Sequence, residues 1–455
     1  MQPEPEVSSA AVAAQRVRLL RVLGVGFGLA VIIGNTIGSG ILGTPGKVAA
    51  WLPNLWLFFG VWVVGGLYAL LGAISLAELG TMIPRSGGQY VFARRALGPF
   101  AGFVVGWSDW LSTCGSTAAV SILIGDYAGV LFPALAGRSV AVALAITTAT
   151  AILQWRGIHW GSRFQNLSSL FKALAFVALV AACFILGGGA RETGTQPAAP
   201  AAAALSLPFA LVLALQAVVY TYDGWSGVIY FSEEVREPGR NIPRALFGGV
   251  LLIIAIYLLV NLALVYVLPL RRLAGDDLAL GTAAEAVFGL YGDTLFRSLM
   301  AVSMLSGINA FHLMATRVLF AMSRDRLGAD AAVKVNRGGT PTVALFASAA
   351  VAVLFIVGGE KFETVINALA FFFVANYTMS FISVFVLRRR EPERERPYRA
   401  WGYPWTTGLA LLGSLAFLAG AVAADLAGGT RSSLYALLML AMSYPAYLLL
   451  RRFSS

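Results

Sequence analysis

The sequence predicts an all-α membrane protein with twelve transmembrane helices, of which the first and the sixth are broken. Of its 455 residues, 58% are hydrophobic and 12% are charged, whereas a soluble domain averages about 25% charged residues. Apolar stretches of about 20 residues, long enough to cross a bilayer, recur along the chain. Two of these stretches have glycines and polar residues in their middle, which interrupt the apolar pattern.

The apolar stretches follow one another with short polar loops between them. Their approximate limits are 22–51 (broken), 54–82, 98–131, 138–155, 168–187, 206–235 (broken), 244–268, 292–323, 341–358, 362–387, 404–424 and 431–450. The two broken spans each open a block of five spans, about 21–187 and 206–387. Because five is an odd number, we expect the second block to run inverted relative to the first.

The remaining segments are predicted from their composition. Residues 1–20 are polar and lack the apolar core of a signal peptide, so we expect a cytoplasmic arm. Residues 21–390 are expected to form a core of ten helices. Residues 391–403 belong to a charged stretch that contains prolines, which predicts a solvated cytoplasmic linker. Residues 404–455 are expected to form the last two helices and a short cytoplasmic tail. The stretch 84–97 mixes aromatic residues with arginines and predicts an interfacial helix on the inner face.

The charge distribution predicts an orientation. Most of the 33 lysines and arginines lie in loops on one side of the predicted spans. Since cytoplasmic loops are enriched in basic residues, we expect a multi-pass protein of the cell inner (cytoplasmic) membrane with both termini in the cytoplasm. The same bias explains the formal charge of +11 without a nucleic-acid partner. Cys114 and Cys183 fall inside apolar spans and are expected to be reduced core residues.

The first break is the sequence GNTIGSGI at 34–41. Each glycine weakens a helix by about 1 kcal/mol, and lipid offers no water to the freed backbone groups. The break therefore indicates a bound ligand or ion. Gly38, Ser39 and Gly40 can present N–H groups at the N-terminus of the outer half-helix, which attracts a carboxylate. The alternative is that the small residues only let two helices approach closely.

The second break is the sequence YTYDGWSG at 220–227. An acidic residue at the bilayer centre costs about 2.5–3.5 kcal/mol on insertion scales, so Asp223 is expected to face the protein interior, a cation or water. It is a candidate for an ammonium site, and helix capping or packing is the alternative. Tyr222 and Trp225 either close over a ligand or belong to the core. Two interrupted spans at matching positions are typical of a transporter site.

Four motifs carry a resemblance to a known family. They are GNTIGSGIL at 34–42, the stretch from Ala77 to Trp107, the stretch from Tyr220 to Leu246, and ATRVLFAMSRDRLG at 315–328. In these motifs the chain resembles the amino acid–polyamine–organocation (APC) superfamily, within its L-type amino acid transporter-like and bacterial amino acid permease branches. The resemblance implies the LeuT-type fold, with a 5+5 inverted repeat, broken helices 1 and 6, and two additional C-terminal helices.

The resemblance also implies a substrate site. The α-carboxylate would meet Gly38, Ser39 and Gly40, and selectivity for the side chain would come from the third, sixth and eighth spans. Backbone carbonyls that would receive the α-ammonium correspond to Thr36, Ile37, Tyr220 and Asp223. Residues at the selectivity positions are Ser112, Ser116, Trp225, Phe311 and His312. Ser226 stands where relatives that carry cationic substrates have a glutamate, so neutral L-amino acids are the expected substrates.

Lys172 is a candidate coupling residue. It lies near the start of the fifth predicted span, where some members of the resembled family place a lysine instead of a sodium site. Its ammonium would tether the fifth span to the first, and loss of its proton would release that tether. The alternative is a lysine that snorkels to the inner headgroups. Likewise, His312 is either a proton sensor or a hydrogen-bonded core residue.

Several acidic residues lie close to arginines near the cytoplasmic ends of the predicted spans. Glu78, Glu233 and Glu234 are therefore expected to form ion pairs of a gate or a loop. Arg317, inside the eighth span, is expected to reach a carboxylate or the inner interface.

The function expected from these features is secondary active transport of amino acids by alternating access, through proton symport or exchange. A channel or an amino acid sensor that does not transport are the alternatives. An enzyme is not expected, because the only histidines are His159 and His312 and no reactive cluster stands within a span. The expected partners are the amino acid, membrane lipid and in one scheme protons. No cofactor, metal or obligatory protein partner is expected, since no external cysteine is available for a disulfide.

Overall fold

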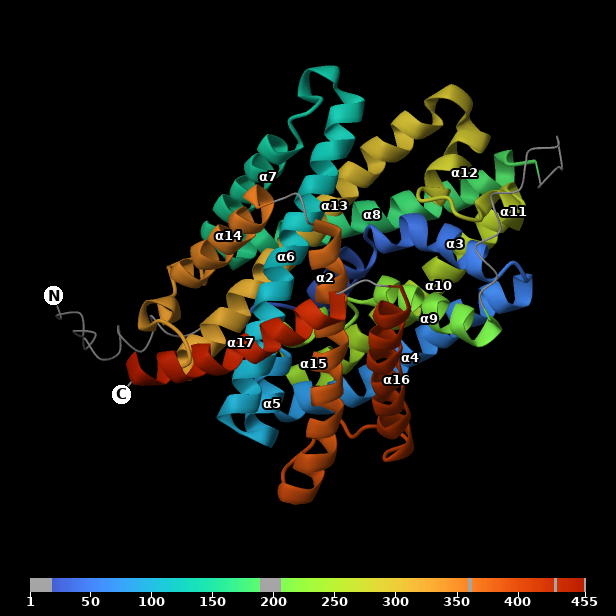
Figure 1. Ribbon diagram of the computed structural model, residues 1–455. Helices are drawn as coiled ribbons and strands as arrows, with labels where there is room; N and C mark the ends of the chain where they lie inside the picture. The colour runs from blue at the N-terminus through green and yellow to red at the C-terminus, as the bar shows by residue number, and fades with distance from the viewer. Residues whose placement is uncertain (1–18, 189–205, 359–361, 429–431, 454–455) are drawn as a thin grey trace.

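The computed structural model describes residues 19–188, 206–358, 362–428 and 432–453, and these ranges are built almost entirely from helices (Figure 1). The α-helices are α2 (Val25–Thr36), α3 (Gly40–Trp51), α4 (Leu55–Met82), α5 (Gln89–Leu97), α6 (Pro99–Leu131), α7 (Ser139–Trp155), α8 (Ile158–Leu186), α9 (Leu207–Tyr222), α10 (Pro238–Val267), α11 (Leu270–Leu273), α12 (Ala279–Phe288), α13 (Gly292–Arg324), α14 (Thr342–Val357), α15 (Phe362–Arg390), α16 (Trp405–Gly428) and α17 (Ser432–Phe453). Short 3-10 helices are η1 (Pro133–Leu135), η2 (Gly227–Phe231), η3 (Gly289–Tyr291) and η4 (Asp330–Val333). The predicted arm, 1–20, lies outside the described residues except for its last two.

The all-α prediction is confirmed in the part of the chain that the structure describes. Eight helical segments there are long and apolar enough to cross a membrane, and the bent pair of α2 and α3 can count as a ninth. Three further helices, α7, α14 and the stretch Ala436–Leu448 of α17, are apolar but shorter. Twelve spans in two inverted blocks remain a prediction.

Both predicted breaks are present. The axes of α2 and α3 differ by 48°, and Ile37, at the end of α2, has extended backbone angles. At the second break, helix α9 ends at Tyr222. Gly224 follows with φ of 103°, in the left-handed region that glycine adopts without steric cost, and the chain continues as the 3-10 helix η2.

The long helices α6 and α13 form the most extensive helix–helix contact of the described molecule. Helices α7 and α14 lie beside them at one edge of the bundle (Figure 1). Helix α2 packs against α8, α10 and α13, whereas α3 packs against α9, α11 and α12. The first break therefore lies between neighbours from both halves of the chain.

Helix α8 corrects the predicted limit of the fifth span. It begins at Ile158 rather than near residue 168, directly after Gly157, whose φ is 134°. The polar residues of its first turns read as a loop in the sequence. Gln165, which lies before the predicted limit, and Ser169, just after it, are buried and donate hydrogen bonds to the carbonyl of Ala30 at 3.1 and 2.7 Å. They are polar because they join two helices.

The predicted interfacial helix exists as α5 but is buried inside the protein. Tyr90 and Phe92 are 0% exposed, and α5 packs against α6 and α15. Its arginines face acidic residues: Arg94 Nη1 lies 3.2 Å from Asp325, and Arg95 pairs with Glu391 at 2.9 Å. The aromatic side of the amphipathic pattern therefore packs on protein, and the two arginines, which are 33% and 31% exposed, also form ion pairs.

The linker at 391–403 is mostly exposed, as predicted, and it also contacts the core at a few residues. Glu78 of α4 accepts hydrogen bonds from Arg388 Nε at 2.9 Å and from the backbone N–H of Ala400 at 2.6 Å. Arg396, 5% exposed, lies 3.2 Å from the same carboxylate. The ion pairs expected for Glu78 are thus present, and they hold the linker against α4.

Candidate functional site

A cavity of about 80 Å³ lies between the two broken helices. Its wall brings together most of the predicted site residues: Thr36, Ile37, Gly38, Ser39, Gly40, Ser116, Lys172, Tyr220, Asp223 and Phe311. The first break contributes one side and the end of α9 contributes another. A cavity needs about 10–15 Å³ of such volume to hold one water, so this space can hold a small polar molecule.

The two breaks are held together by close contacts. A Cβ added to Gly40 would lie 3.1 Å from the Cα of Thr221, so only glycine allows this approach without displacement. The hydroxyl of Tyr257 donates to the carbonyls of Thr36 and Thr221 at 2.7 and 3.1 Å, and thereby joins the ends of α2 and α9. The geometry of the cavity depends on both contacts.

The N-terminus of α3 faces the cavity. Helix α3 begins at Gly40 after Ser39, and no side chain caps it. The first N–H groups of an α-helix have no acceptor within the helix, and the macrodipole adds about half a positive charge there. Since Ser39 and Gly40 line the cavity, this wall is suited to an anionic group.

The carboxylate of Asp223 binds protein. Its Oδ1 accepts a hydrogen bond of 2.7 Å from the hydroxyl of Tyr377 on α15. Tyr377 also lies 3.2 Å from the hydroxyl of Ser226 and stacks on the ring of Trp225 with centroids 4.9 Å apart. Among the predicted roles of Asp223, this geometry favours contact between its side chain and the protein, which leaves the backbone at the end of α9 to face the cavity.

Lys172 lies in the middle of α8 and not at the start of a span. Its side chain is 1% exposed, and its Nζ donates to the carbonyls of Gly34 and Ile37 at 2.9 and 2.6 Å. The snorkelling alternative is therefore wrong, because the ammonium points into the protein at the end of α2. The ammonium donates hydrogen bonds to two carbonyls that the break in the helix leaves without a backbone donor.

Two of the carbonyls predicted for a ligand ammonium already accept protein donors. Ile37 accepts from Lys172, and Thr36 accepts from Tyr257. A carbonyl oxygen has two lone pairs, so each retains the capacity for one further hydrogen bond. An ammonium at this wall would share these oxygens with Lys172 and Tyr257.

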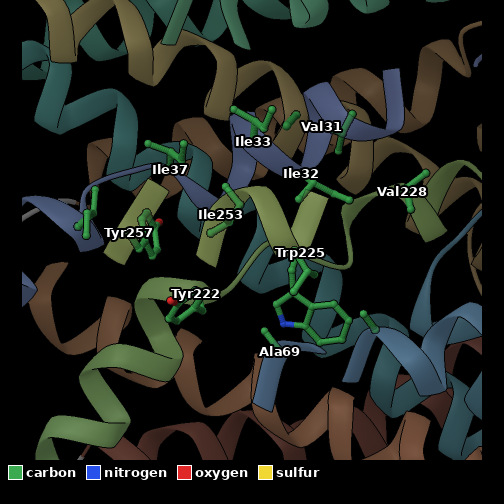
Figure 2. Close-up of a cluster of buried hydrophobic side chains, with 14 of the residues drawn as sticks. Val31, Ile32, Ile33, Ile37, Ala69, Tyr222, Trp225, Val228, Ile253 and Tyr257 are labelled. Carbon is green, nitrogen blue, oxygen red and sulfur yellow. The ribbon is translucent and has the colours of Figure 1, made fainter. Parts of the chain in front are cut away.

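Three predicted site residues do not line the cavity. The hydroxyl of Ser112 donates to the carbonyl of Asp109 within its own helix at 3.0 Å. Trp225 belongs to the cluster of buried hydrophobic side chains in Figure 2 and packs against Gly72 of α4. His312 is buried and is hydrogen-bonded to the backbone of Thr147 on α7, as expected for a core histidine. Successive helix residues differ by about 100° in direction, so the side chain next to Phe311 faces elsewhere.

The cavity is also lined by residues that were not among the predicted site residues. Asn35 and Thr221 were recognisable in the sequence as polar residues within the breaks, and both line the cavity. Met304 of α13 and Phe373 of α15 line it as well. The last two are apolar residues in apolar helices, so nothing in the sequence distinguished them from core residues.

Ion pairs close the arginine-rich end of the molecule. Arg317 and Glu234 form a two-pronged pair with both distances 2.9 Å, and both side chains are 0% exposed. Arg324 binds Glu233 at 2.8 Å. Asp325 additionally receives Arg85 at 3.2 Å and the hydroxyl of Tyr90 at 3.0 Å. The expected pairs of Arg317 and the two glutamates are confirmed, and they join the segment after the second break to α13.

The opposite end is hollow. A cavity of about 790 Å³ lies there between α3, α6, α9 and α16. It shares Ser39, Gly40 and Tyr220 with the smaller cavity. The larger space therefore leads to the breaks from the end opposite the ion pairs.

Removing one partner of the buried pair at the closed end is expected to destabilise the protein. Arg317→Met leaves Glu234 as an unpaired buried charge, which typically costs about 3–5 kcal/mol. We expect a clear fall in the unfolding temperature of the purified protein in detergent. Arg297→Met is the matched control, because the pair of Arg297 with Asp293 is 23% and 31% exposed and such pairs contribute about 1 kcal/mol or less. Equal effects of the two substitutions would contradict the importance of the buried pair.

Known proteins support one family for this chain. The model of the family described as "Amino acid permease" matches residues 28–443. The serine/threonine exchanger SteT of Bacillus subtilis is 29% identical over 90% of this chain and 92% of its own length. The mouse Asc-type amino acid transporter 1 is 29% identical over 85% of this chain and 74% of its own. The mouse large neutral amino acids transporter small subunit 2 is 28% identical over 87% and 75%.

These matches span both breaks and most of the described helices, including the walls of the cavity. The resemblance to the APC superfamily that the motifs indicated is thereby confirmed. The chain is an integral membrane protein and belongs to the amino acid permease family of the APC superfamily.

Proposed function

We propose that this protein transports small neutral L-amino acids across the cell membrane by alternating access. The observation that carries this proposal is the cavity between the breaks, which offers different chemistry on its two sides. The uncapped N-terminus of α3 at Gly40 suits a carboxylate. The carbonyl ends of α2 and α9, at Ile37 and Tyr220, suit an ammonium. A free amino acid carries both groups on one carbon.

The size and lining of the cavity favour small neutral side chains. Its volume is about 80 Å³, and Phe311 and Phe373 occupy its apolar side. The described lining contains one carboxylate, Asp223, and Tyr377 already binds it. A cationic side chain would therefore meet no uncommitted carboxylate in this wall. The name of one relative, a serine/threonine exchanger, agrees with this substrate class, whereas another relative is named a large neutral amino acids transporter.

The proposed orientation has the ion-paired end in the cytoplasm, because basic loops lie there. In this orientation the large cavity lies toward the outside, and we propose that this form is outward-facing. In this arrangement α7, α14 and α17 complete twelve spans in two inverted blocks of five with two additional helices. Lys172 is proposed as the coupling residue, since loss of its proton would weaken the contact between α8 and the end of α2.

Liposomes that contain only the purified protein test this function. We expect labelled serine, threonine or alanine to enter, and to enter faster when the same amino acids are present inside, as exchange requires. Entry driven by an imposed pH gradient into liposomes without internal amino acid would instead indicate proton symport. Arginine serves as the control and is expected not to compete.

The alternative functions give distinct results in the same assay. Ligand binding without entry would indicate a sensor, and entry that does not saturate with amino acid concentration would indicate a channel. Entry that requires a second protein chain would contradict the proposal that one chain suffices.

A further inference from the structure

A buried acid without a cationic partner among the described residues lies outside the substrate cavity. Asp109 of α6 is 1% exposed. Its Oδ1 accepts a hydrogen bond of 2.8 Å from the hydroxyl of Tyr230. Its Oδ2 is buried and has no hydrogen-bond partner among the residues that the structure describes. Asp109 does not line either of the two cavities described above, so substrate binding gives no reason for an acid at this position.

The ionisable groups packed around α6 do not neutralise Asp109. Helices α7 and α14 contain no ionisable residue. From η2 the facing group is Tyr230. From the end of α9 it is Asp223, whose negative charge would repel a carboxylate at Asp109. Tyr377 of α15 donates its hydrogen bond to Asp223. The described part of α17 brings Tyr444 and Tyr447, which pack on Phe100 near the start of α6.

The cations on the remaining neighbours, α5 and α13, are committed elsewhere. The committed pairs are Arg94 with Asp325, Arg95 with Glu391, Arg297 with Asp293, Arg317 with Glu234 and Arg324 with Glu233. Tyr90 donates to Asp325, and His312 is bonded to Thr147. Within the described residues, no cation therefore contacts Asp109. A buried carboxylate without a cation or a full set of donors is strongly disfavoured, whereas the neutral acid is tolerated.

We propose that Asp109 is a proton-binding site that is occupied while the ion-paired end of the molecule is closed and emptied when that end opens. The proposal rests on the alternating access proposed above and adds a second ionisable group to Lys172. It assigns a role to an acid on α6 that lies away from the substrate and from the first break.

The position of Tyr230 links the proton to the movement. Tyr230 lies in η2, directly after the second break, and its carbonyl accepts from the N–H of Gly87 at 3.2 Å. Its ring covers Gly88, where an added Cβ would lie 2.5 Å from Cε1. Opening of this end requires η2 to leave α6 and the 87–88 turn, which withdraws the tyrosine and admits water. The carboxyl O–H bond then breaks, its proton passes to water, and the hydrated carboxylate remains until closure reverses the step.

The sign of the pH effect follows from this sequence. Opening releases a proton to the cytoplasm, so a low internal pH favours the closed end and a high internal pH favours opening. If opening of the ion-paired end is the slowest step of exchange, the exchange rate in liposomes rises with internal pH. For release of one proton, the rise is at most about tenfold per pH unit. The side-specific test varies the internal pH while the external pH is fixed.

The variants are chosen around Asp109. Asp109→Asn carries a neutral amide, so its exchange rate is expected to lose the dependence on internal pH that Asp109 causes. Asp109→Glu is expected to retain this dependence, with its midpoint at a different pH. Asp126→Asn is the matched control, since Asp126 lies on the same helix but is exposed. Comparison with the wild type cancels any contribution from Lys172, which is unchanged in all of them.

The outcomes separate this inference from the proposed function. A pH profile of Asp109→Asn that matches the wild type, or a wild type without any dependence on internal pH, overturns the proton site. Absence of amino acid exchange by the wild type at every pH instead overturns the transport proposal. If Asp109→Asn cannot be purified, Asp109→Glu decides the question, because an unshifted midpoint in that variant contradicts the assignment.

Discussion

Replacement of Lys172 by methionine is expected to reduce amino acid exchange by at least about tenfold. Methionine nearly keeps the length of the side chain but removes the two hydrogen bonds of the ammonium to the carbonyls of Gly34 and Ile37. Hydrogen bonds to charged groups contribute about 1.5–3 kcal/mol each, and 1.36 kcal/mol corresponds to a factor of ten in rate. Without these donors, the end of α2 loses two hydrogen bonds to α8, while the bonds of Gln165 and Ser169 to Ala30 remain.

The exchange assay is combined with measurement of thermal stabilisation by serine, which separates loss of binding from loss of movement. Lys334→Met is the control, because Lys334 is exposed in the loop before α14. Exchange at the wild-type rate in Lys172→Met would show that the tether is dispensable. Uptake that requires sodium and is insensitive to this substitution would contradict the proposed coupling role.

The contacts of Lys172 illustrate what the sequence could and could not predict. The first break was predictable because three glycines and an asparagine interrupt an apolar span. The family resemblance implied that Lys172 would tether the fifth span to the first, but the sequence pattern alone did not, because the polar first turns of α8 favoured a loop. Gln165 and Ser169 are polar because they bond to Ala30 of α2, a partner distant in sequence. The register of one helix against another is a property of packing and is not encoded in the pattern of either helix alone.

The selectivity side of the cavity was less predictable for a similar reason. Trp225 and His312 stood at plausible positions but face a hydrophobic cluster and α7. Phe373 and Tyr377 of α15 contribute to the cavity or hold Asp223, yet they lie among other aromatic residues in an apolar helix. Backbone chemistry was predictable, because glycine and helix ends have the same properties in any fold. The direction of an apolar side chain required the three-dimensional structure.

Replacement of Gly40 by leucine is expected to abolish amino acid binding. The first added atom, Cβ, already lies 3.1 Å from the Cα of Thr221, which is backbone and cannot turn aside. The further carbons must either separate α3 from α9 or enter the cavity of about 80 Å³, where they cover the N–H groups at the start of α3. We expect affinity for serine to fall at least about hundredfold, which is about 2.7 kcal/mol, as measured by calorimetry on the purified protein.

Two glycines of the same broken span serve as controls that separate the effect of position from the loss of a glycine. Gly26 of α2 is exposed and has no atom within 4 Å of an added Cβ, so Gly26→Leu is expected to bind serine normally. At Gly38 the nearest atom to an added Cβ is 4.0 Å away, and Gly38→Ala is expected to weaken binding less than Gly40→Leu. Unaltered affinity in Gly40→Leu would mean that the substrate carboxylate does not bind at the start of α3, whereas equal losses in all three variants would point to general disruption of the helix. A loss of serine affinity that is largest in Gly40→Leu, smaller in Gly38→Ala and absent in Gly26→Leu would link substrate binding to the contact between the two breaks.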